Sequence, residues 1–158
     1  MTPTSSNAAG AGSAAAIPAA AAWLGGLGLL PFAAPVAVLW LGPADWEGEA
    51  WRVLRAYAAV ILSFVGAIHW GAALRENEAG RLWRAMGWSV VPALVAWVAL
   101  LLAPPSGVAL LLLGFGAQYW MDRWAVAAGW LPGWYGRLRR ILTSGVVACL
   151  ALALVWAA

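Results

Sequence analysis

Long apolar stretches separated by short polar connections run through most of the chain. The first stretch, residues 17–41, contains no charged residue, and four others lie at about 53–74, 84–103, 108–128 and 139–157. A helix needs about 20 apolar residues to cross the hydrocarbon core of a bilayer, which is about 30 Å thick. The pattern predicts an all-α membrane protein, in which residues 17–158 form one bundle of five transmembrane helices.

Proline residues and charged residues refine the bounds of these helices. Pro31 and Pro35 predict a kink and not an end, because neighbouring helices in a bundle can satisfy the carbonyls that a proline frees. The run Pro104 to Gly107 predicts a tight turn between the third and fourth helices. The fourth helix must continue through Asp122 and Arg123 to about residue 128, because the stretch from Val108 to those charges is too short to span.

Residues 1–16 form an uncharged segment rich in Ala, Ser, Gly and Thr. Such a composition cannot bury enough apolar surface to fold, so it predicts a disordered tail. A cleaved signal peptide is the alternative for the first apolar stretch. The absence of a positively charged n-region and the length of the stretch favour retention as a helix.

The arginines are distributed unequally between the two ends of the predicted helices. One end carries Asp45, Glu47 and Glu49 beside Arg52 and Arg55, whereas the other carries Arg75, Arg81, Arg84, Arg123, Arg137, Arg139 and Arg140. Short loops rich in positive charge remain in the cytoplasm, or in the matrix of a mitochondrion. The distribution predicts an N-terminus inside and a C-terminus outside.

Composition supports a lipid environment and excludes several chemistries. The chain is 65% hydrophobic and only 9% charged, and all of its basic residues are Arg. Without Lys it cannot form a Schiff base with retinal or pyridoxal phosphate, nor a P-loop. One His and one Cys, Cys149, cannot supply an ordinary zinc site within one chain. The arginines flank apolar runs and form no basic stripe, so nucleic acid is not an expected partner.

The 13 Trp residues predict aromatic belts at the two membrane interfaces. We expect an outer belt and an inner belt, formed respectively by Trp40, Trp46 and Trp51 and by Trp83, Trp88, Trp120, Trp124, Trp130 and Trp134. The alternative, strongest for Trp70 beside His69, is that some indoles line a pocket for a flat hydrophobic ligand.

Polar residues on four predicted helices fall at one depth near the inner face: His69, Ser89, Gln118 and Asp122, and Thr143. Gly114, Gln118 and Asp122 are spaced four residues apart and share one helix face. The small residues between Ala59 and Trp70 form a second stripe on one face, and we expect helices to pack at both stripes. An unpaired carboxylate at this depth is costly, so Asp122 is expected to pair with Arg139 or Arg140. That pair could be structural or could take part in binding or proton movement. His69 could pack between helices, contact a ligand or ligate haem.

Four ordered motifs resemble those of one family: ILSFVGAIHWG (61–71), WSVVPALVAW (88–97), GFGAQYWMDR (114–123) and WYGRLRRILT (134–143). They are similar to the membrane family known as domain of unknown function 3429, over Leu27 to Val155. The resemblance implies a bacterial or mitochondrial inner membrane and no assigned reaction. It directs attention to His69, Trp70, Ser89, Pro92, Gln118, Asp122, Trp134, Tyr135, Arg137, Arg139 and Thr143. Arg140 is a further candidate, as an alternative partner of Asp122. In helix number and Trp content the chain is also similar to the tryptophan-rich sensory proteins, which bind tetrapyrroles, but their Trp-x-Pro-Pro string is absent.

Three functions remain open on this basis, and the last of them is an intramembrane enzyme. The first is a non-enzymatic accessory or assembly component of an inner-membrane complex, because loops of about 10 residues leave no room for a soluble catalytic module. The second is a binder or carrier of a small hydrophobic ligand, such as a tetrapyrrole, quinone or lipid, near His69, Trp70, Gln118 and Asp122. No catalytic residue, metal or cofactor is expected, with haem or another tetrapyrrole as the alternative. The expected partners are the lipid bilayer and other membrane-protein subunits or a second copy of the chain.

Overall fold

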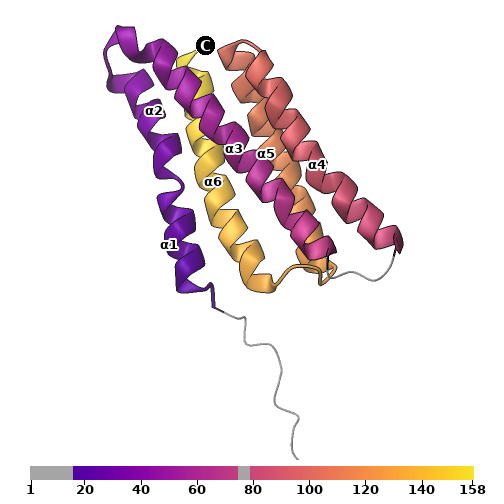
Figure 1. Ribbon diagram of the computed structural model, residues 1–158. Helices are drawn as coiled ribbons and strands as arrows, with labels where there is room; N and C mark the ends of the chain where they lie inside the picture. Colours follow the sequence, from indigo (N-terminus) through magenta and orange to yellow (C-terminus); the bar gives the residue numbers. More distant parts are fainter. Residues whose placement is uncertain (1–15, 75–78) are drawn as a thin grey trace, which may run out of the picture.

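The computed structural model describes residues 16–74 and 79–158, and over this part of the chain it contains helices and no strand (Figure 1). The elements are α1 (Ala19–Leu27), α2 (Leu30–Leu41), the short 3-10 helix η1 (Ala44–Trp46), α3 (Glu47–Ala73), α4 (Ala79–Leu101), α5 (Pro104–Ala127) and α6 (Gly133–Trp156). Since α1 and α2 lie end to end, the bundle has five rods that alternate in direction. The predicted all-helical bundle is confirmed. The predicted tail, Arg75 and the side chain of Arg81 lie outside the described residues.

Four rods of the described chain are long and apolar enough to cross a membrane: Ala19–Leu41, Ala44–Ala73, Leu82–Leu101 and Gly133–Trp156. The chain is therefore a multi-pass membrane protein whose surroundings are a lipid bilayer. Helix α5 is of similar length, 24 residues, but it carries Gln118, Asp122 and Arg123.

The break between α1 and α2 lies at Gly28 and Leu29, and Pro31 is the second residue of α2. The Tyr57 hydroxyl on α3 donates a hydrogen bond of 3.0 Å to the Gly28 carbonyl. A neighbouring helix thus satisfies a carbonyl freed at the break, and the chain continues in the same direction (Figure 1). The prediction of one kinked helix is partly wrong, because α1 ends at Leu27, before Pro31, and a separate helix begins at Leu30 and continues through Pro35.

Four helices begin earlier than the sequence pattern predicts, and one of them is α4, which starts at Ala79 and not near 84. Helix α3 starts at Glu47 and not near 53, because Glu47 and Glu49 lie in its first turn, where the helix dipole favours acidic residues. Helix α5 starts at Pro104 and not at 108, because proline suits the first helical positions. Helix α6 starts at Gly133, after Pro132, and not at 139. The predicted connection between residues 128 and 139 is therefore helical from Gly133 onward, and Arg137 lies in the helix.

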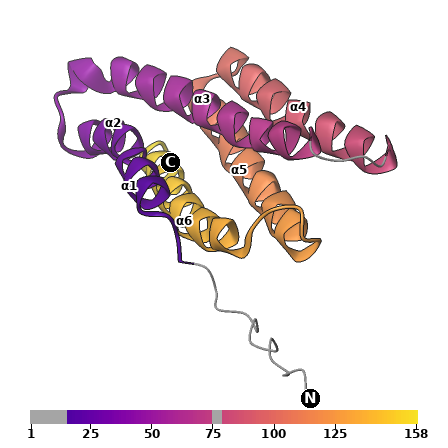
Figure 2. The same ribbon diagram turned by 60° about the horizontal axis from the view of Figure 1, so that its bottom comes forward.

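The core lies between α3, α5, α6 and α2, with α4 packed against α3 and α5 (Figure 2). Phe32 makes edge-to-face contacts with Tyr57 and Phe115, with ring centroids 5.0 and 6.0 Å apart. Leucines from three helices, Leu62, Leu111 and Leu150, are completely buried beside them. Because these side chains pack closely against one another, each helix that contributes to the core is held in one orientation about its own axis.

Two glycines allow the helices to approach closely where the sequence predicts packing. A Cβ atom on Gly66 would lie 2.8 Å from Pro92 of α4, and one on Gly114 would lie 2.7 Å from Leu62 of α3. The packing role of both stripes is confirmed, although the neighbour of Gly114 is a side chain and not a backbone. Trp70, placed at the end of the first stripe, is 44% exposed and lies outside the packed face.

A single arginine holds the connection between α4 and α5. The two N–H groups of Arg55 Nη2 are shared among the carbonyl oxygens of Ala99, Leu100 and Leu102, at 2.9, 2.8 and 2.6 Å. Ala99 and Leu100 lie in the last turn of α4, where an α-helix leaves carbonyls without intrahelical partners, and Leu102 directly follows the helix. Gly107 packs closely against the end of α4, because a Cβ atom at this position would clash with the Ala99 carbonyl oxygen. Arg55 therefore fixes α3 to the α4–α5 hairpin.

The connection between α5 and α6 is an ordered turn. Gly129 has a positive φ of 77°, a conformation that costs glycine little. The Gly129 and Trp130 amides donate to the carbonyls of Val126 and Ala125, at 3.1 and 2.8 Å. This Schellman arrangement ends α5 and turns Trp130 back onto Trp124, with ring centroids 4.9 Å apart.

Candidate functional site

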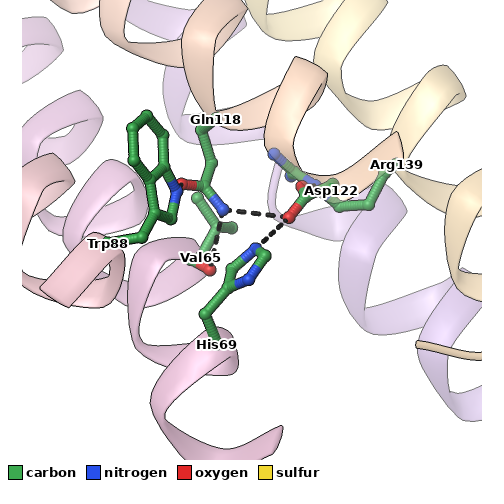
Figure 3. A network of polar contacts seen from close by, with 6 residues as sticks. All are labelled: Val65, His69, Trp88, Gln118, Asp122 and Arg139. Atoms are coloured by element: carbon green, nitrogen blue, oxygen red, sulfur yellow. Dashed lines mark hydrogen bonds and ion pairs between the residues drawn. The ribbon is translucent and has the colours of Figure 1, made fainter. Parts of the chain in front are cut away.

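Asp122, on α5, is the centre of a buried polar network (Figure 3). Its Oδ1 atom accepts a hydrogen bond of 2.9 Å from Gln118 Nε2 and lies 2.8 Å from His69 Nε2. Its Oδ2 atom accepts a hydrogen bond of 2.6 Å from Arg139 Nε. The ionised carboxylate with the Arg139 guanidinium forms a neutral pair, and His69 adds a positive charge only when it is protonated.

Gln118 extends this network to two more helices. Its Oε1 atom accepts a hydrogen bond of 3.0 Å from the Trp88 indole of α4 (Figure 3). Its Nε2 atom also lies 3.4 Å from the Val65 carbonyl of α3. The network therefore connects α3, α4, α5 and α6 through one amide and one carboxylate.

Burial decides what this network can do. Gln118 and Asp122 are 0% exposed, His69 is 2% exposed and Arg139 is 5% exposed. The predicted cation partner of Asp122 is thus confirmed as Arg139, whereas Arg140 is exposed. Both carboxylate oxygens are occupied by protein groups, so a bound molecule has no free Asp122 atom to contact. This geometry supports the structural interpretation of the pair.

Ser89 and Trp134, which the sequence also singles out, make other contacts. The Ser89 hydroxyl donates to the Met86 carbonyl in its own helix, at 2.6 Å. The Trp134 ring packs on Tyr135, with centroids 6.2 Å apart. Arg137 is half-buried on α6. The shared depth of Ser89 and His69 therefore does not bring their polar atoms together.

Three polar atoms on one face of α6 are buried without a hydrogen-bond partner among the described residues. They are Tyr135 Oη, Arg139 Nη2 and Thr143 Oγ1, on residues spaced four apart. Buried polar groups of this kind are commonly satisfied by internal water. The face is therefore less completely paired than the Asp122 carboxylate beside it.

Substituting the two hydroxyl-bearing residues of this face tests that description. We expect Tyr135→Phe and Thr143→Val each to change the free energy of unfolding by less than about 1 kcal/mol, because neither removes a hydrogen bond to protein. Reversible unfolding in mixed micelles, followed by tryptophan fluorescence, measures it. A loss above about 2 kcal/mol would mean that the hydroxyl binds an ordered water or another molecule.

A cleft of about 330 Å³ opens beside the network, between α4 and α5. It is lined by His69, Arg84, Ala85, Trp88, Val91, Trp120, Met121, Trp124 and Trp130. The volume is at the lower end of the range for small-molecule sites, which are typically apolar and aromatic with a few polar groups. His69 and Trp88 belong to both the cleft and the network, so the buried bonds to Asp122 and Gln118 hold two of its walls in place.

The sequence predicts a ligand near His69, Trp70, Gln118 and Asp122, and this cleft includes one of these four residues. His69 lines the cleft, but Trp70, Gln118 and Asp122 do not. Its main walls are indoles that the sequence analysis assigned to the inner belt. The sequence spacing could have indicated this cleft. Arg84 and Trp88 are four residues apart and share a helix face, and the same is true of Trp120 and Trp124. Trp51, assigned to the outer belt, is buried instead and packs on Trp156 with ring centroids 6.0 Å apart.

Comparison with protein families identifies the family of this chain and assigns no activity to it. The model described as "Protein of unknown function (DUF3429)" matches residues 17–155, from the start of α1 almost to the end of α6. The chain belongs to the DUF3429 family. The resemblance found in the four sequence motifs is thereby confirmed.

One curated relative supports this membership of DUF3429. Transmembrane protein 69 of Xenopus tropicalis is 35% identical over 138 residues, which cover 85% of this chain and 53% of that protein. The chain thus spans about half the length of the curated relative it matches. No solved structure matches the chain.

The polar network of this DUF3429 chain lies at one end of the bundle and not along its whole axis. Apolar side chains with no exposed surface, among them Leu62, Leu111, Phe115 and Leu150, fill the next layer of the core. Within the described residues, no group of three or more His, Cys, Asp or Glu side chains could hold a metal ion. The arrangement is that of a tryptophan-lined cleft beside a buried polar network.

A larger cavity of about 490 Å³ adjoins the cleft and shares Ala85 and Trp130 with it. Its walls are the end of α3 and the α5–α6 turn, and they consist mainly of glycine and alanine. Few side chains there could recognise a ligand. The tryptophan-lined cleft is therefore the stronger candidate site of the DUF3429 fold.

Proposed function

We propose that this protein is a non-enzymatic, membrane-embedded binder of a small, largely apolar molecule, and that the cleft between α4 and α5 is the binding site. The observation that carries the proposal is the convergence of Trp88, Trp120, Trp124 and Trp130 on one cleft of about 330 Å³. Indole rings offer large rigid apolar surfaces that lose little conformational entropy on binding.

The fixed position of the cleft walls supports the same proposal. Trp88 is held by its hydrogen bond to Gln118, and Trp130 is held by the turn at Gly129. A preformed site loses less free energy to ordering when a ligand binds. Because Asp122 is paired within the protein, we assign it the role of holding the cleft walls in place. We assign contact with the ligand to the indoles.

Native mass spectrometry of the protein, extracted from its own membrane in mild detergent, tests this function. We expect a reproducible adduct of a few hundred daltons, on the order of a small cleft ligand. The double variant Trp120→Ala, Trp124→Ala should lose the adduct, because it removes two walls of the cleft. Trp97→Ala is the matched control, since Trp97 is an exposed indole of α4 that does not line the cleft. An adduct that persists in the double variant would place binding elsewhere or assign it to bulk lipid.

An accessory or assembly role in a membrane complex is the second candidate. Its support is that the described connections are short, such as Leu102–Ala103 between α4 and α5, so helix faces form nearly all of the surface. The faces of α4 and α6 carry exposed Trp97, Leu101 and Val155. In the same spectrum, added mass of tens of kilodaltons would support a protein partner or a second copy.

We further infer that α5 is a fifth membrane span, with the N-terminus inside and the C-terminus outside. Gln118 and Asp122 are buried and paired within the bundle, so they need not face lipid. The end of the bundle where α5 finishes carries Arg84, Arg123 and Arg140, and the opposite end carries Asp45, Glu47 and Glu49 (Figure 1). This distribution favours the arginine-rich end inside, in a bacterial inner membrane or a mitochondrial inner membrane.

A reporter fused after Ala158 tests this topology. Alkaline phosphatase at that position should be active and green fluorescent protein should not, because only the former matures outside the cytoplasm. A fusion within the α5–α6 turn, after Gly129, should give the opposite pattern. Cytoplasmic activity of the fusion after Ala158 would contradict both the span count and the orientation.

A further inference from the structure

The lining of the cleft carries positive charge and no negative charge. Arg84 is the one arginine among its lining residues, and none of those residues is acidic. Asp122 is close to His69 but is completely buried, and it is already paired with Arg139. The other acidic residues of the described chain, Asp45, Glu47 and Glu49, belong to η1 and the first turn of α3, at the far end of the bundle. The cleft therefore presents an exposed guanidinium with no carboxylate from this part of the chain.

The cleft is also polarised along the membrane normal. Arg84, Trp88 and Val91 lie at i, i+4 and i+7 on α4, which share one helix face and rise about 10 Å toward the middle of the bundle. On the antiparallel helix α5, Trp124 lies near the arginine-rich end and Trp120 one turn deeper. The charged group is thus at the interfacial end and the apolar walls lead inward.

We propose that the ligand of this cleft is a small amphiphilic carboxylic acid, whose anionic head pairs with Arg84 and whose single apolar body lies between Trp88, Trp120 and Trp124. This inference rests on the proposed ligand-binding function and specifies its chemistry. The planar guanidinium matches a carboxylate with two parallel hydrogen bonds. The cleft volume of about 330 Å³ accommodates one apolar body and not the two acyl chains of a phospholipid.

Dodecanoic acid and dodecan-1-ol are suitable probes, because they have the same chain and differ in the charge of the head. Purified protein in dodecyl maltoside at pH 8 is titrated with each, and the bound fraction is measured by native mass spectrometry. We expect the acid to bind at least about tenfold more tightly than the alcohol. Arg84→Gln should weaken binding of the acid to the level of the alcohol, and Arg84→Lys should retain part of the preference, because a lysine keeps the charge without the bidentate geometry.

Arg123→Gln is the matched control. It removes one positive charge from the same end of the bundle, but Arg123 does not line the cleft. The control should keep the preference for the acid, which separates a local ion pair from the general positive field. Arg84 is exposed, so its replacement removes no core contact, and an unchanged unfolding midpoint of Arg84→Gln confirms that it folds.

Each outcome of the titration is decisive. If acid and alcohol bind equally and Arg84→Gln changes neither, the anionic head is overturned while the proposed function stands. If Arg123→Gln reduces acid binding as much as Arg84→Gln does, the local pairing is overturned. If phosphatidylglycerol displaces the acid, the site belongs to a bilayer phospholipid and the single-chain assignment is wrong. If neither probe binds and the native protein carries no adduct, the proposed function itself is overturned.

Discussion

Asp122→Asn is expected to destabilise the bundle by about 3–5 kcal/mol, the range observed when one partner of a buried ion pair is removed. The substitution leaves Arg139, which is 5% exposed, without an anion. It also places an amide donor opposite the Arg139 Nε–H or the His69 ring, where Asp122 now accepts. Unfolding by sodium dodecyl sulfate in mixed micelles, followed by tryptophan fluorescence, gives the free energy difference.

The double variant Asp122→Asn, Arg139→Gln is the informative control. It removes the unpaired cation together with the anion, so it should be less destabilised than Asp122→Asn alone. The comparison isolates the coupling between the two residues. A loss below about 1 kcal/mol for Asp122→Asn would contradict the structural role and would require the carboxylate to act elsewhere.

Arg55→Met is the second large effect that we expect, a loss of about 2–3 kcal/mol. Methionine preserves much of the apolar stem of the side chain but leaves three carbonyls at the α4–α5 connection without their charged donor. Those carbonyls lie at a helix end, so no backbone amide of α4 can replace Arg55. The same unfolding assay measures the change, and amide hydrogen exchange should show faster opening at the α4–α5 connection.

Arg52→Met provides a matched comparison one turn earlier in α3. Arg52 is exposed and pairs with Glu49 on the surface, so its replacement should leave the unfolding midpoint unchanged. Equal effects of Arg52→Met and Arg55→Met would show that loss of positive charge, and not the three carbonyl contacts, determines stability at this end.

The main features of the fold were predictable because the solvent is lipid. Uninterrupted apolar stretches such as 17–41 have no other stable location, and the cost of an isolated carboxylate required a cation for Asp122. The starts of α3 and α6 were not predictable in the same way. Charged residues at a helix end can extend into the interfacial region, so Glu47, Glu49 and Arg137 are compatible with helix or loop.

The cleft was harder to predict than the network. An indole near a membrane interface can face lipid or a neighbouring helix, and the choice depends on the rotation of each helix about its axis. Trp83 and Trp88 illustrate this, because both were assigned to the same belt. Trp83 is 80% exposed, whereas Trp88 turns inward and donates to Gln118. That rotation follows from packing at Gly66 and Pro92, which sequence spacing alone does not determine.

The ion pair between α5 and α6 has a consequence for biogenesis. Arg139 follows Asp122 by 17 residues, so Asp122 reaches the translocon while its partner is still inside the ribosome. Helix α5 alone would bring an uncompensated acid to lipid, whereas the α5–α6 hairpin brings a neutral pair. Helix α5 should therefore wait at the translocon and enter the bilayer together with α6, as one unit, after the preceding helices have already partitioned into lipid.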